Sequence, residues 1–167
     1  MSKANFTGRL VKRIDDKNYT LDFTDFRGKT LEEDLLHRDF TINAIALELE
    51  KLFSPAPLNN SLIDPYSAGG HLKAGVIRAV NKKAFSEDPL RILRAFSFAC
   101  ILDFNIDKET LRLIKLEKNK LSRVSSERIR DELFKIFDTP CALECILTLD
   151  ELKILKIIFP EIEKMRG

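Results

Sequence analysis

Hydrophobic and polar positions follow a different period in each part of the chain. Near the N-terminus, β-branched and aromatic residues crowd residues 6–14 and 19–23, and the polar residues 15–18 separate them. Two strand-favouring runs around a cluster of turn residues are typical of a β-hairpin. After residue 80, apolar residues recur at helical spacing instead. The pattern therefore predicts a strand-containing part followed by an array of helices.

Start and stop signals give the expected helices their approximate limits. Thr30 stands three residues before Glu33 and an apolar run, which is the spacing of a capping box and predicts a short helix. Proline and glycine are concentrated in residues 54–70, where we expect a boundary between sub-domains. Three longer helices are expected around residues 90–100, 111–116 and 125–137, and two short ones before Pro160.

The composition is that of a globular protein. Of the 167 residues, 44% are hydrophobic and 32% are charged, so the chain can bury a core and is not of the disordered class. No apolar run approaches the roughly 20 residues of a membrane helix, and the polar start lacks a signal-peptide core. We therefore expect a cytoplasmic protein without a membrane partner. A net charge of +2 permits nucleic-acid binding without favouring it.

Cysteine and histidine offer little for a metal site. Cys141 and Cys145 are four residues apart and share a helix face, whereas Cys100 lies in an apolar run. The chain has only two histidines, His37 and His71, and neither is near a cysteine in sequence. A zinc site is therefore not expected, and the three cysteines are interpreted as buried structural thiols.

A first polar cluster, residues 37–44, sets Arg38, Asp39 and Asn43 among apolar anchors. Arginine donates hydrogen bonds in a fork and aspartate accepts them, so the cluster suits a sugar hydroxyl and phosphate oxygens. The plainer interpretation is a salt bridge at a helix end, with Asn43 as a turn residue.

A second cluster, residues 87–94, pairs an acceptor with a donor. Pro89 suits the first turn of a helix, and Asp88 and Arg91 are three residues apart on one face, which Arg94 continues. Cytosine and adenine present an amino donor beside a ring-nitrogen acceptor, whereas uracil and guanine present the reverse order. An Asp–Arg pair could therefore accept C and A and reject U and G. The plainer interpretation is an ion pair worth a few tenths of a kcal/mol.

A third cluster, residues 124–133, is by itself a capped amphipathic helix. In this order, however, the clusters resemble the class II CCA-adding enzymes and bacterial poly(A) polymerases, the tRNA nucleotidyltransferase family, from about Leu10 to the end. The matching motifs are residues 38–44 (ribose recognition), 64–66 with 72 and 77–80 (connector of head and neck), 87–91 with 94–95 (base recognition), and 126–129 with 132–133 (neck).

The resemblance implies roles for individual residues. Asp88 and Arg91 would act as the protein template for C and A. The ribose and triphosphate would be held by Arg38 and Asp39. The other roles implied are Asn43 supporting that loop, Arg94 helping to hold the nucleotide, Glu87, Glu127 and Arg128 supporting the site, and Asp22 as a possible third catalytic carboxylate.

The family's reaction also needs a Gly-Gly-x-x-Arg-Asp loop and an Asp-x-Asp pair that binds two Mg²⁺ ions. No Asp-x-Asp occurs in these 167 residues. Glu48-x-Glu50 and Glu161-x-Glu163 have the spacing but stand in the wrong order relative to the other motifs. We therefore expect no metal ligand in this chain and a metal-binding part upstream of Met1.

Smaller departures concern His37, in place of the usual first arginine of the ribose motif, and Ser97, where a further nucleotide-facing arginine is common. Ser67 and Ala68 stand where the connector usually has glycines. Because the C-terminal residues resemble the start of a further domain, both ends are expected to be cut, as in a partial reading frame, a split gene or a truncated chain.

The expected fold is α+β: an incomplete nucleotidyltransferase palm, with a β-hairpin and short helices, then an all-α neck and the start of the body. The expected domains are the partial head (1–75), the neck (76–138) and the start of the body (139–167). An incomplete palm would leave an open sheet edge at residues 6–14 or the neighbouring strand, and such an edge invites pairing with another chain.

The expected function is nucleotide selection in a template-independent enzyme that adds C and/or A to the 3′ end of tRNA, or A to RNA. The expected partners are ATP, CTP, the RNA 3′ end and a chain that supplies the missing palm segment, with Mg²⁺ as cofactor. Alone, the chain is expected to be inactive. The alternative is a non-catalytic module that binds RNA or nucleotide, or a helical interaction scaffold.

Overall fold

The computed structural model describes residues 7–53, 57 and 61–165 and divides into two compact units, residues 1–37 and 38–167. The strands are β1 (Thr7–Ile14), β2 (Lys17–Thr24), β3 (Ala46–Leu47), β4 (Leu62–Ile63), β5 (Val76–Ile77) and β6 (Asn105–Ile106). The α-helices are α1 (Leu31–Leu36), α2 (Ala68–Lys73), α3 (Ala84–Glu87), α4 (Arg91–Leu102), α5 (Lys108–Glu117), α6 (Ser126–Phe137), α7 (Ala142–Glu151), α8 (Leu155–Ile158) and α9 (Ile162–Met165). Within the described ranges, every helix is too short or too polar to cross a membrane.

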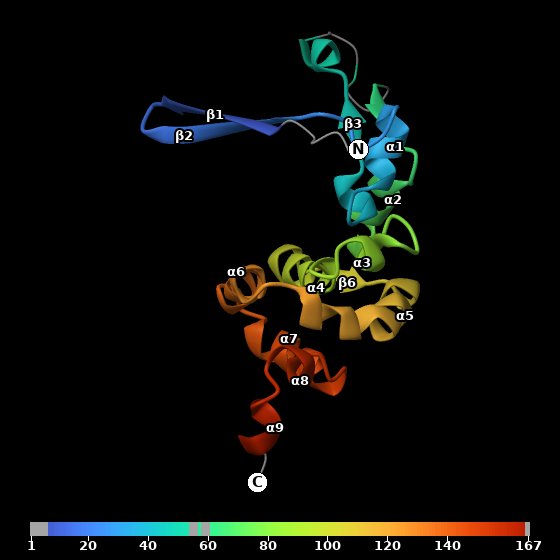
Figure 1. Ribbon diagram of the computed structural model, residues 1–167. Helices are drawn as coiled ribbons and strands as arrows, with labels where there is room; N and C mark the ends of the chain where they lie inside the picture. The colour runs from blue at the N-terminus through green and yellow to red at the C-terminus, as the bar shows by residue number, and fades with distance from the viewer. Residues whose placement is uncertain (1–6, 54–56, 58–60, 166–167) are drawn as a thin grey trace, which may run out of the picture. The chain divides into compact units, whose positions relative to one another are not determined.

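The first unit contains the expected hairpin, in which β1 and β2 pair antiparallel (Figure 1). Its turn consists of Asp15 and Asp16, with φ angles of 47° and 61°. Two successive left-handed residues are the mark of a type I′ turn, whose twist matches that of the flanking strands. The hairpin prediction is confirmed. The turn is shorter than the polar cluster predicted, because Lys17 and Asn18 already belong to β2.

The two faces of the hairpin differ in polarity. Arg9 and Asp22 are opposite each other on the polar face, whereas Leu10 lies opposite Leu21 on the apolar face. Leu10 is 50% exposed and Leu21 54% exposed. Within the described residues, this sheet contains only β1 and β2, so both outer edges lack a partner strand there. An unpaired strand edge of this kind can accept a further strand.

Helix α1 begins where the capping signal predicted. The Thr30 hydroxyl accepts a hydrogen bond from the backbone N–H of Glu33, with 3.2 Å between Oγ1 and N. The Glu33 carboxylate closes the other half of the motif on the N–H of Lys29 rather than of Thr30, at 2.5 Å. These two hydrogen bonds satisfy backbone N–H groups at the start of the helix, which have no acceptor within the helix itself.

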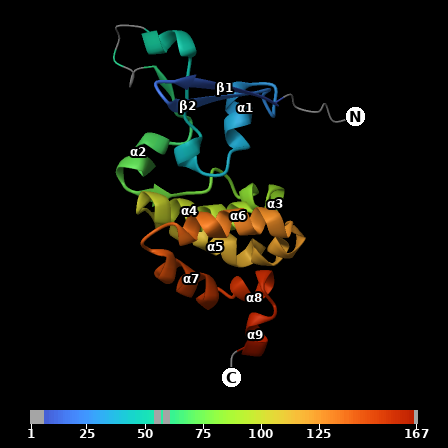
Figure 2. The same ribbon diagram turned by 90° about the vertical axis from the view of Figure 1, so that its left-hand side faces the viewer.

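The second unit is built around α4, which packs side by side with α6 (Figures 1 and 2). The helices expected after residue 80 are present, and most of their periodic apolar positions join the core, although Leu116 and Phe137 are more than half exposed. The parallel pair β5–β6 was not predicted, because strands of two residues are too short to show a period. Together the hairpin and the helical array confirm the α+β fold class.

The compact units divide between His37 and Arg38, so the described residues after His37 belong to the same unit as the helical part. The domains 1–75, 76–138 and 139–167 describe a family architecture and stay a prediction. Of the expected boundary segment at 54–70, residues 54–56 and 58–60 lie outside the described residues.

The three cysteines gather where α4 approaches α7. Cys145 is buried, as expected, whereas Cys100 and Cys141 are half-buried. Burial raises the pKa of the Cys100 thiol, and the neighbouring thiols of Cys141 and Cys145 raise it further. A thiol that resists ionisation is a poor nucleophile, which agrees with a structural role.

Candidate nucleotide-binding site

The segment that begins the second unit is held to the backbone of residues 78–80. The N–H of Thr41 donates to the carbonyl of Arg78 at 2.8 Å, and the N–H of Val80 donates to the carbonyl of Asp39 at 3.1 Å. Between them, the Phe40 side chain is fully buried and meets the Phe98 ring edge-to-face, with 5.9 Å between centroids. This anchoring fixes the position of Asp39 in the second unit.

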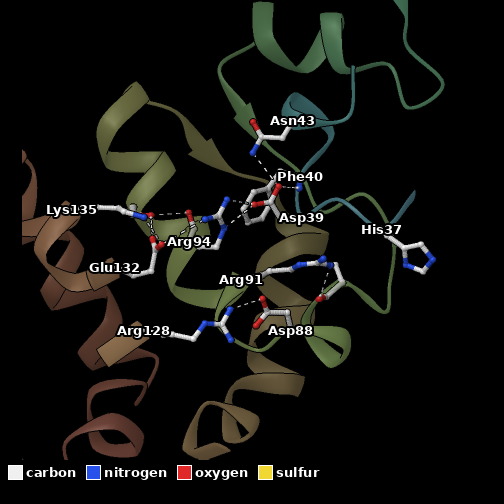
Figure 3. Close-up of polar contacts among 12 residues, drawn as sticks. His37, Asp39, Phe40, Asn43, Asp88, Arg91, Arg94, Arg128, Glu132 and Lys135 are labelled. Atoms are coloured by element: carbon white, nitrogen blue, oxygen red, sulfur yellow. Dashed lines mark hydrogen bonds and ion pairs between the residues drawn. The ribbon is translucent and has the colours of Figure 1, made fainter. Parts of the chain in front are cut away.

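Asp39 is a buried carboxylate whose two oxygens are both engaged (Figure 3). Oδ1 accepts from the Phe40 N–H at 2.8 Å and from Nδ2 of Asn43 at 3.0 Å. Oδ2 accepts from Nε and Nη2 of Arg94 at 2.9 and 2.7 Å. Burial acts to raise the pKa of Asp39, but the Asn43 hydrogen bond and the Arg94 charge outweigh it and lower that pKa overall.

Arg94 connects three elements of the second unit. Its guanidinium binds Asp39, stands 5.1 Å from the centroid of the Phe98 ring, and places Nη1 3.6 Å from Oε1 of Glu132 on α6. Its side chain is 32% exposed, whereas those of Asp39 and Glu132 are 8% and 5% exposed. Arg94 is therefore held between two buried carboxylates and against an aromatic ring (Figure 3).

The predicted base-recognition residues lie where α3 ends and α4 begins. Asp88 is the C-cap residue of α3, and its Oδ1 accepts from the N–H of Leu90 at 3.2 Å. Its other oxygen accepts from Nη2 of Arg128 on α6 at 2.9 Å (Figure 3). The chain thus holds a carboxylate at this turn, and an ion pair connects it to α6.

Arg91 has different partners. Its Nη1 donates to the carbonyl of Ala84 at 3.1 Å and lies 3.6 Å from the Glu87 carboxylate. Its side chain is 8% exposed, whereas that of Asp88 is 30% exposed. Of the two residues, Asp88 is therefore the more accessible from solvent.

The structure brings most of the predicted residues of the second unit into two groups. One contains Asp39, Asn43 and Arg94, and the other joins Asp88 to Arg128 and Arg91 to Glu87. The remaining predicted residues of this unit are Arg38, half-buried beside Asp39 in the chain, and Glu127, exposed in the first turn of α6.

Asp22 belongs to the other unit. Both of its oxygens bind the guanidinium of Arg9, at 2.6 Å from Nε and 2.9 Å from Nη2. Hydrogen bonding to Arg9 lowers the pKa of this exposed carboxyl. Asp22 is thus occupied by a cross-strand ion pair on the polar face of the hairpin.

The resemblance placed Glu132 in the neck motif and Ser97 where a further arginine is common, but it assigned neither residue a contact in the site. Glu132 is 3% exposed and accepts from the Ser97 hydroxyl at 2.8 Å and from Lys135 Nζ at 2.6 Å. A signal was present, because Glu132 lies at helical spacing among the buried apolar residues of α6. Burying a charged residue among apolar residues costs free energy unless it has a polar partner, so its position on the apolar face of α6 predicts such a partner.

The described carboxylates do not fit the Mg²⁺ that the resemblance implies. Within the described part of the chain, no three histidine, cysteine, aspartate or glutamate side chains are grouped so as to hold a metal ion. Asp22 is neutralised by Arg9 and Asp39 by Arg94, so neither offers a free pair of oxygens to a cation. The two polar groups of the second unit are built from arginine–carboxylate pairs, which suits hydrogen bonding to a ligand rather than metal coordination.

Two family models match the chain. One, described as the poly A polymerase head domain, matches residues 6–78, and the other, described as a probable RNA and SrmB-binding site of polymerase A, matches residues 103–165. A CC-adding tRNA nucleotidyltransferase from Geobacter sulfurreducens is 41% identical over 138 residues, which are 83% of this chain and 30% of that protein. The chain belongs to the family of poly(A) polymerases and tRNA nucleotidyltransferases.

Solved structures of this nucleotidyltransferase family agree. The Thermotoga maritima CCA-adding enzyme complexed with tRNA matches with a TM-score of 0.73 and 37% identity, over 84% of this chain and 33% of that one. A CCA-adding enzyme with CTP matches with a TM-score of 0.76 and 34% identity, over 91% of this chain and 36% of that one. The relatives are enzymes, and this chain spans about a third of their length.

In this family member, the candidate site joins the regions that the two models match. Asp39 lies in the head match and Glu132 in the RNA-binding match. Asp88, Arg91 and Arg94 fall between the two matches, in residues 79–102. The contacts from Arg94 to Asp39 and from Asp88 to Arg128 therefore connect the two matched regions through α4 and the turn before it.

Proposed function

We propose that this chain is the nucleotide-selecting part of a template-independent RNA nucleotidyltransferase that uses CTP and ATP and acts on the 3′ end of tRNA or another RNA. One observation carries the proposal. The turn between α3 and α4 fixes a carboxylate and a guanidinium three residues apart, and the next turn of α4 binds the ribose-motif carboxylate Asp39. The relatives whose names specify CC addition, or a complex with CTP or tRNA, support the same chemistry.

Base selection follows from donor and acceptor order. Asp88 accepts from the amino group that cytosine and adenine present, and Arg91 donates to the adjacent ring nitrogen. Uracil and guanine place a donor opposite Arg91 and an acceptor opposite Asp88, which leaves polar groups unpaired and costs about 1–3 kcal/mol each. Because Arg128 and the Ala84 carbonyl now hold these two side chains, a bound base must replace those contacts.

The sugar and phosphates are assigned to the first polar group. Arg38 contacts the triphosphate, where a guanidinium fork is the preferred partner of phosphate oxygens. A ribose hydroxyl replaces the Asn43 amide at Oδ1 of Asp39, the oxygen that Arg94 does not hold. Arg94 keeps Asp39 in place, and Glu87, Glu127 and Arg128 support the base-recognition turn.

Transfer of the nucleotide is assigned to another segment. The sequence contains no Asp-x-Asp pair, and the described carboxylates do not group around a metal position. We therefore propose that the chain alone is inactive and that a segment or separate chain with the Mg²⁺-binding pair completes it. Asp22 is a third carboxylate for that composite centre only if Arg9 releases it.

A cytoplasmic location of the protein remains a prediction.

A competing function is a module that binds RNA or nucleotide without base selection, or a helical scaffold. The exposed charges of both signs on the neck helices are compatible with it. Such a module binds RNA with strong salt dependence and without preference for the base. Base preference therefore separates the two functions.

The test is competition binding of CTP, ATP, UTP and GTP to the purified chain and to Asp88→Ala and Arg91→Ala variants. We expect CTP and ATP to bind at least about tenfold more tightly than UTP and GTP, and this ratio to fall to within about twofold in both variants. Arg112→Ala is the matched control, because Arg112 is an exposed arginine paired with Glu109. Equal binding of all four nucleotides by the unmodified chain would refute the proposal.

A further inference from the structure

Glu132 is an ionisable side chain in an apolar setting. It lies on the face of α6 that also buries Ile129, Leu133 and Ile136, and it is 3% exposed. Burying a carboxylate costs several kcal/mol unless charges and hydrogen bonds compensate. The groups that contact Glu132 therefore indicate which interaction the buried charge serves.

Three side chains compensate this carboxylate (Figure 3). Oε2 accepts from Ser97 on α4 at 2.8 Å, and Oε1 accepts from Lys135 at 2.6 Å and stands 3.6 Å from Nη1 of Arg94. Lys135 is 48% exposed, so solvent screens its charge. Arg94 is the partner that Glu132 shares with the nucleotide site.

Arg94 lies between two carboxylates that face different nitrogen atoms of its guanidinium group. Asp39 takes Nε and Nη2, and Glu132 faces Nη1. A guanidinium is planar and rigid, so contacts on both sides fix its rotation as well as its position. Since Arg94 holds Oδ2 of Asp39, its orientation determines where Oδ1 points.

We infer that Glu132 is a positioning residue of the nucleotide site, which acts through Arg94 on the ribose-binding carboxylate Asp39. Ser97 of α4 helps to position Glu132, because its hydroxyl donates a hydrogen bond to the Glu132 carboxylate. The inference rests on the proposed function in one respect, the ribose role of Asp39. It separates two properties: Glu132 governs recognition of the sugar, whereas Asp88 and Arg91 govern recognition of the base.

The variant that tests this inference is Glu132→Gln, which keeps the shape and the Ser97 partner but removes the charge. Its matched control is Asp131→Asn, the neighbouring acidic residue of α6, whose side chain is 61% exposed and paired with Arg130. Binding of CTP and of 2′-deoxy-CTP is measured for each protein, together with the CTP to UTP ratio. Exchange of the Arg94 Nε–H proton, followed by NMR, reports on the guanidinium without any nucleotide.

We expect Glu132→Gln to lose most of the preference for CTP over 2′-deoxy-CTP, to keep the preference for CTP over UTP, and to exchange the Arg94 proton about tenfold faster. Asp131→Asn should match the unmodified chain in all three. Unchanged Arg94 exchange or an unchanged sugar preference in Glu132→Gln would overturn the inference. If the unmodified chain binds no nucleotide, the proposed function fails, and the proton exchange alone decides whether Glu132 positions Arg94.

Discussion

At the scale of single residues, the site depends on carboxylates that are buried with a cationic partner. Asp39 is 7% exposed and has donors on both oxygens. Such a group stabilises the fold only while it is ionised, because the protonated acid cannot accept from Arg94 in the same way. If Asp39 binds the ribose as proposed, its charge links nucleotide binding to the stability of the second unit.

Replacing Asp39 with asparagine should destabilise the second unit by about 2–3 kcal/mol near pH 7. This is below the usual cost of breaking a buried pair, because Arg94 is partly exposed. The measurement is urea unfolding followed by circular dichroism. The control is Asp131→Asn, which should change stability by less than about 0.5 kcal/mol.

The difference in unfolding free energy between the unmodified protein and Asp39→Asn should depend on pH with a defined sign. The pKa of Asp39 is lowered from the ordinary value of 3.8. The folded state thus binds its proton less readily than the unfolded state, and the stabilisation is complete above about pH 4. It is lost as the pH falls through the lower, folded-state pKa. The gap between unmodified protein and Asp39→Asn should therefore narrow below pH 4, and a constant gap down to pH 3 would contradict this account.

At the scale of elements, the hairpin turn holds two non-glycine residues in an unfavourable backbone conformation. Asp15 and Asp16 both adopt left-handed backbone angles, which L-residues populate at a cost that is smaller for asparagine and vanishes for glycine. The ion pair of Asp16 with Arg13 adds little, because both side chains are exposed.

The double change Asp15→Asn with Asp16→Gly should stabilise the hairpin by about 0.5 kcal/mol, since Asn-Gly is the favoured type I′ pair. Hydrogen exchange of the β1 and β2 amides is the measurement, and it should slow by roughly twofold. Faster exchange would contradict the cost assigned to the turn conformation. A reversed order, Asp15→Gly with Asp16→Asn, is the matched comparison and should gain less.

Local elements could be predicted from the sequence because their signals are local. The turn residues, the Thr30 cap and the helical period after residue 80 lie within a few positions of the structure they specify. The contacts of the site could not be predicted in the same way. Arg128 reaches Asp88 across 40 positions, Arg94 reaches Asp39 across 55, and Ser97 reaches Glu132 across 35. The packing of α4 with α6 sets the Ser97–Glu132 pair and helps to set the Asp88–Arg128 pair, whereas the anchoring of residues 39–41 to residues 78–80 places Asp39 beside Arg94.

The predicted site residues therefore differ in how they were found. Asp88 and Arg91 stood out because a donor and an acceptor at helical spacing suggested a base edge. Arg94 stood out only as their continuation, although it has the larger set of contacts. Glu132 was placed only within the neck motif, and its partners required the structure, because its burial and its contacts with Ser97 and Arg94 are not visible in the sequence.

At the scale of the whole molecule, the proposed function assigns nucleotide selection to this chain and nucleotide transfer to another segment. The family match covers the head and RNA-binding regions, while the chain spans about a third of the relatives' length. In the proposed function, the two arginine–carboxylate groups recognise the base and the sugar. The absence of an Asp-x-Asp pair from the sequence separates recognition from chemistry.

The most direct test measures binding and incorporation in the same samples. The purified chain is offered tRNA that lacks its 3′ CCA, with Mg²⁺ and each labelled nucleotide in turn. The account predicts that CTP and ATP bind in preference to UTP and GTP and that none is incorporated. Incorporation of C or A by the chain alone would contradict it, because Asp22 or another carboxylate would then have to serve the reaction.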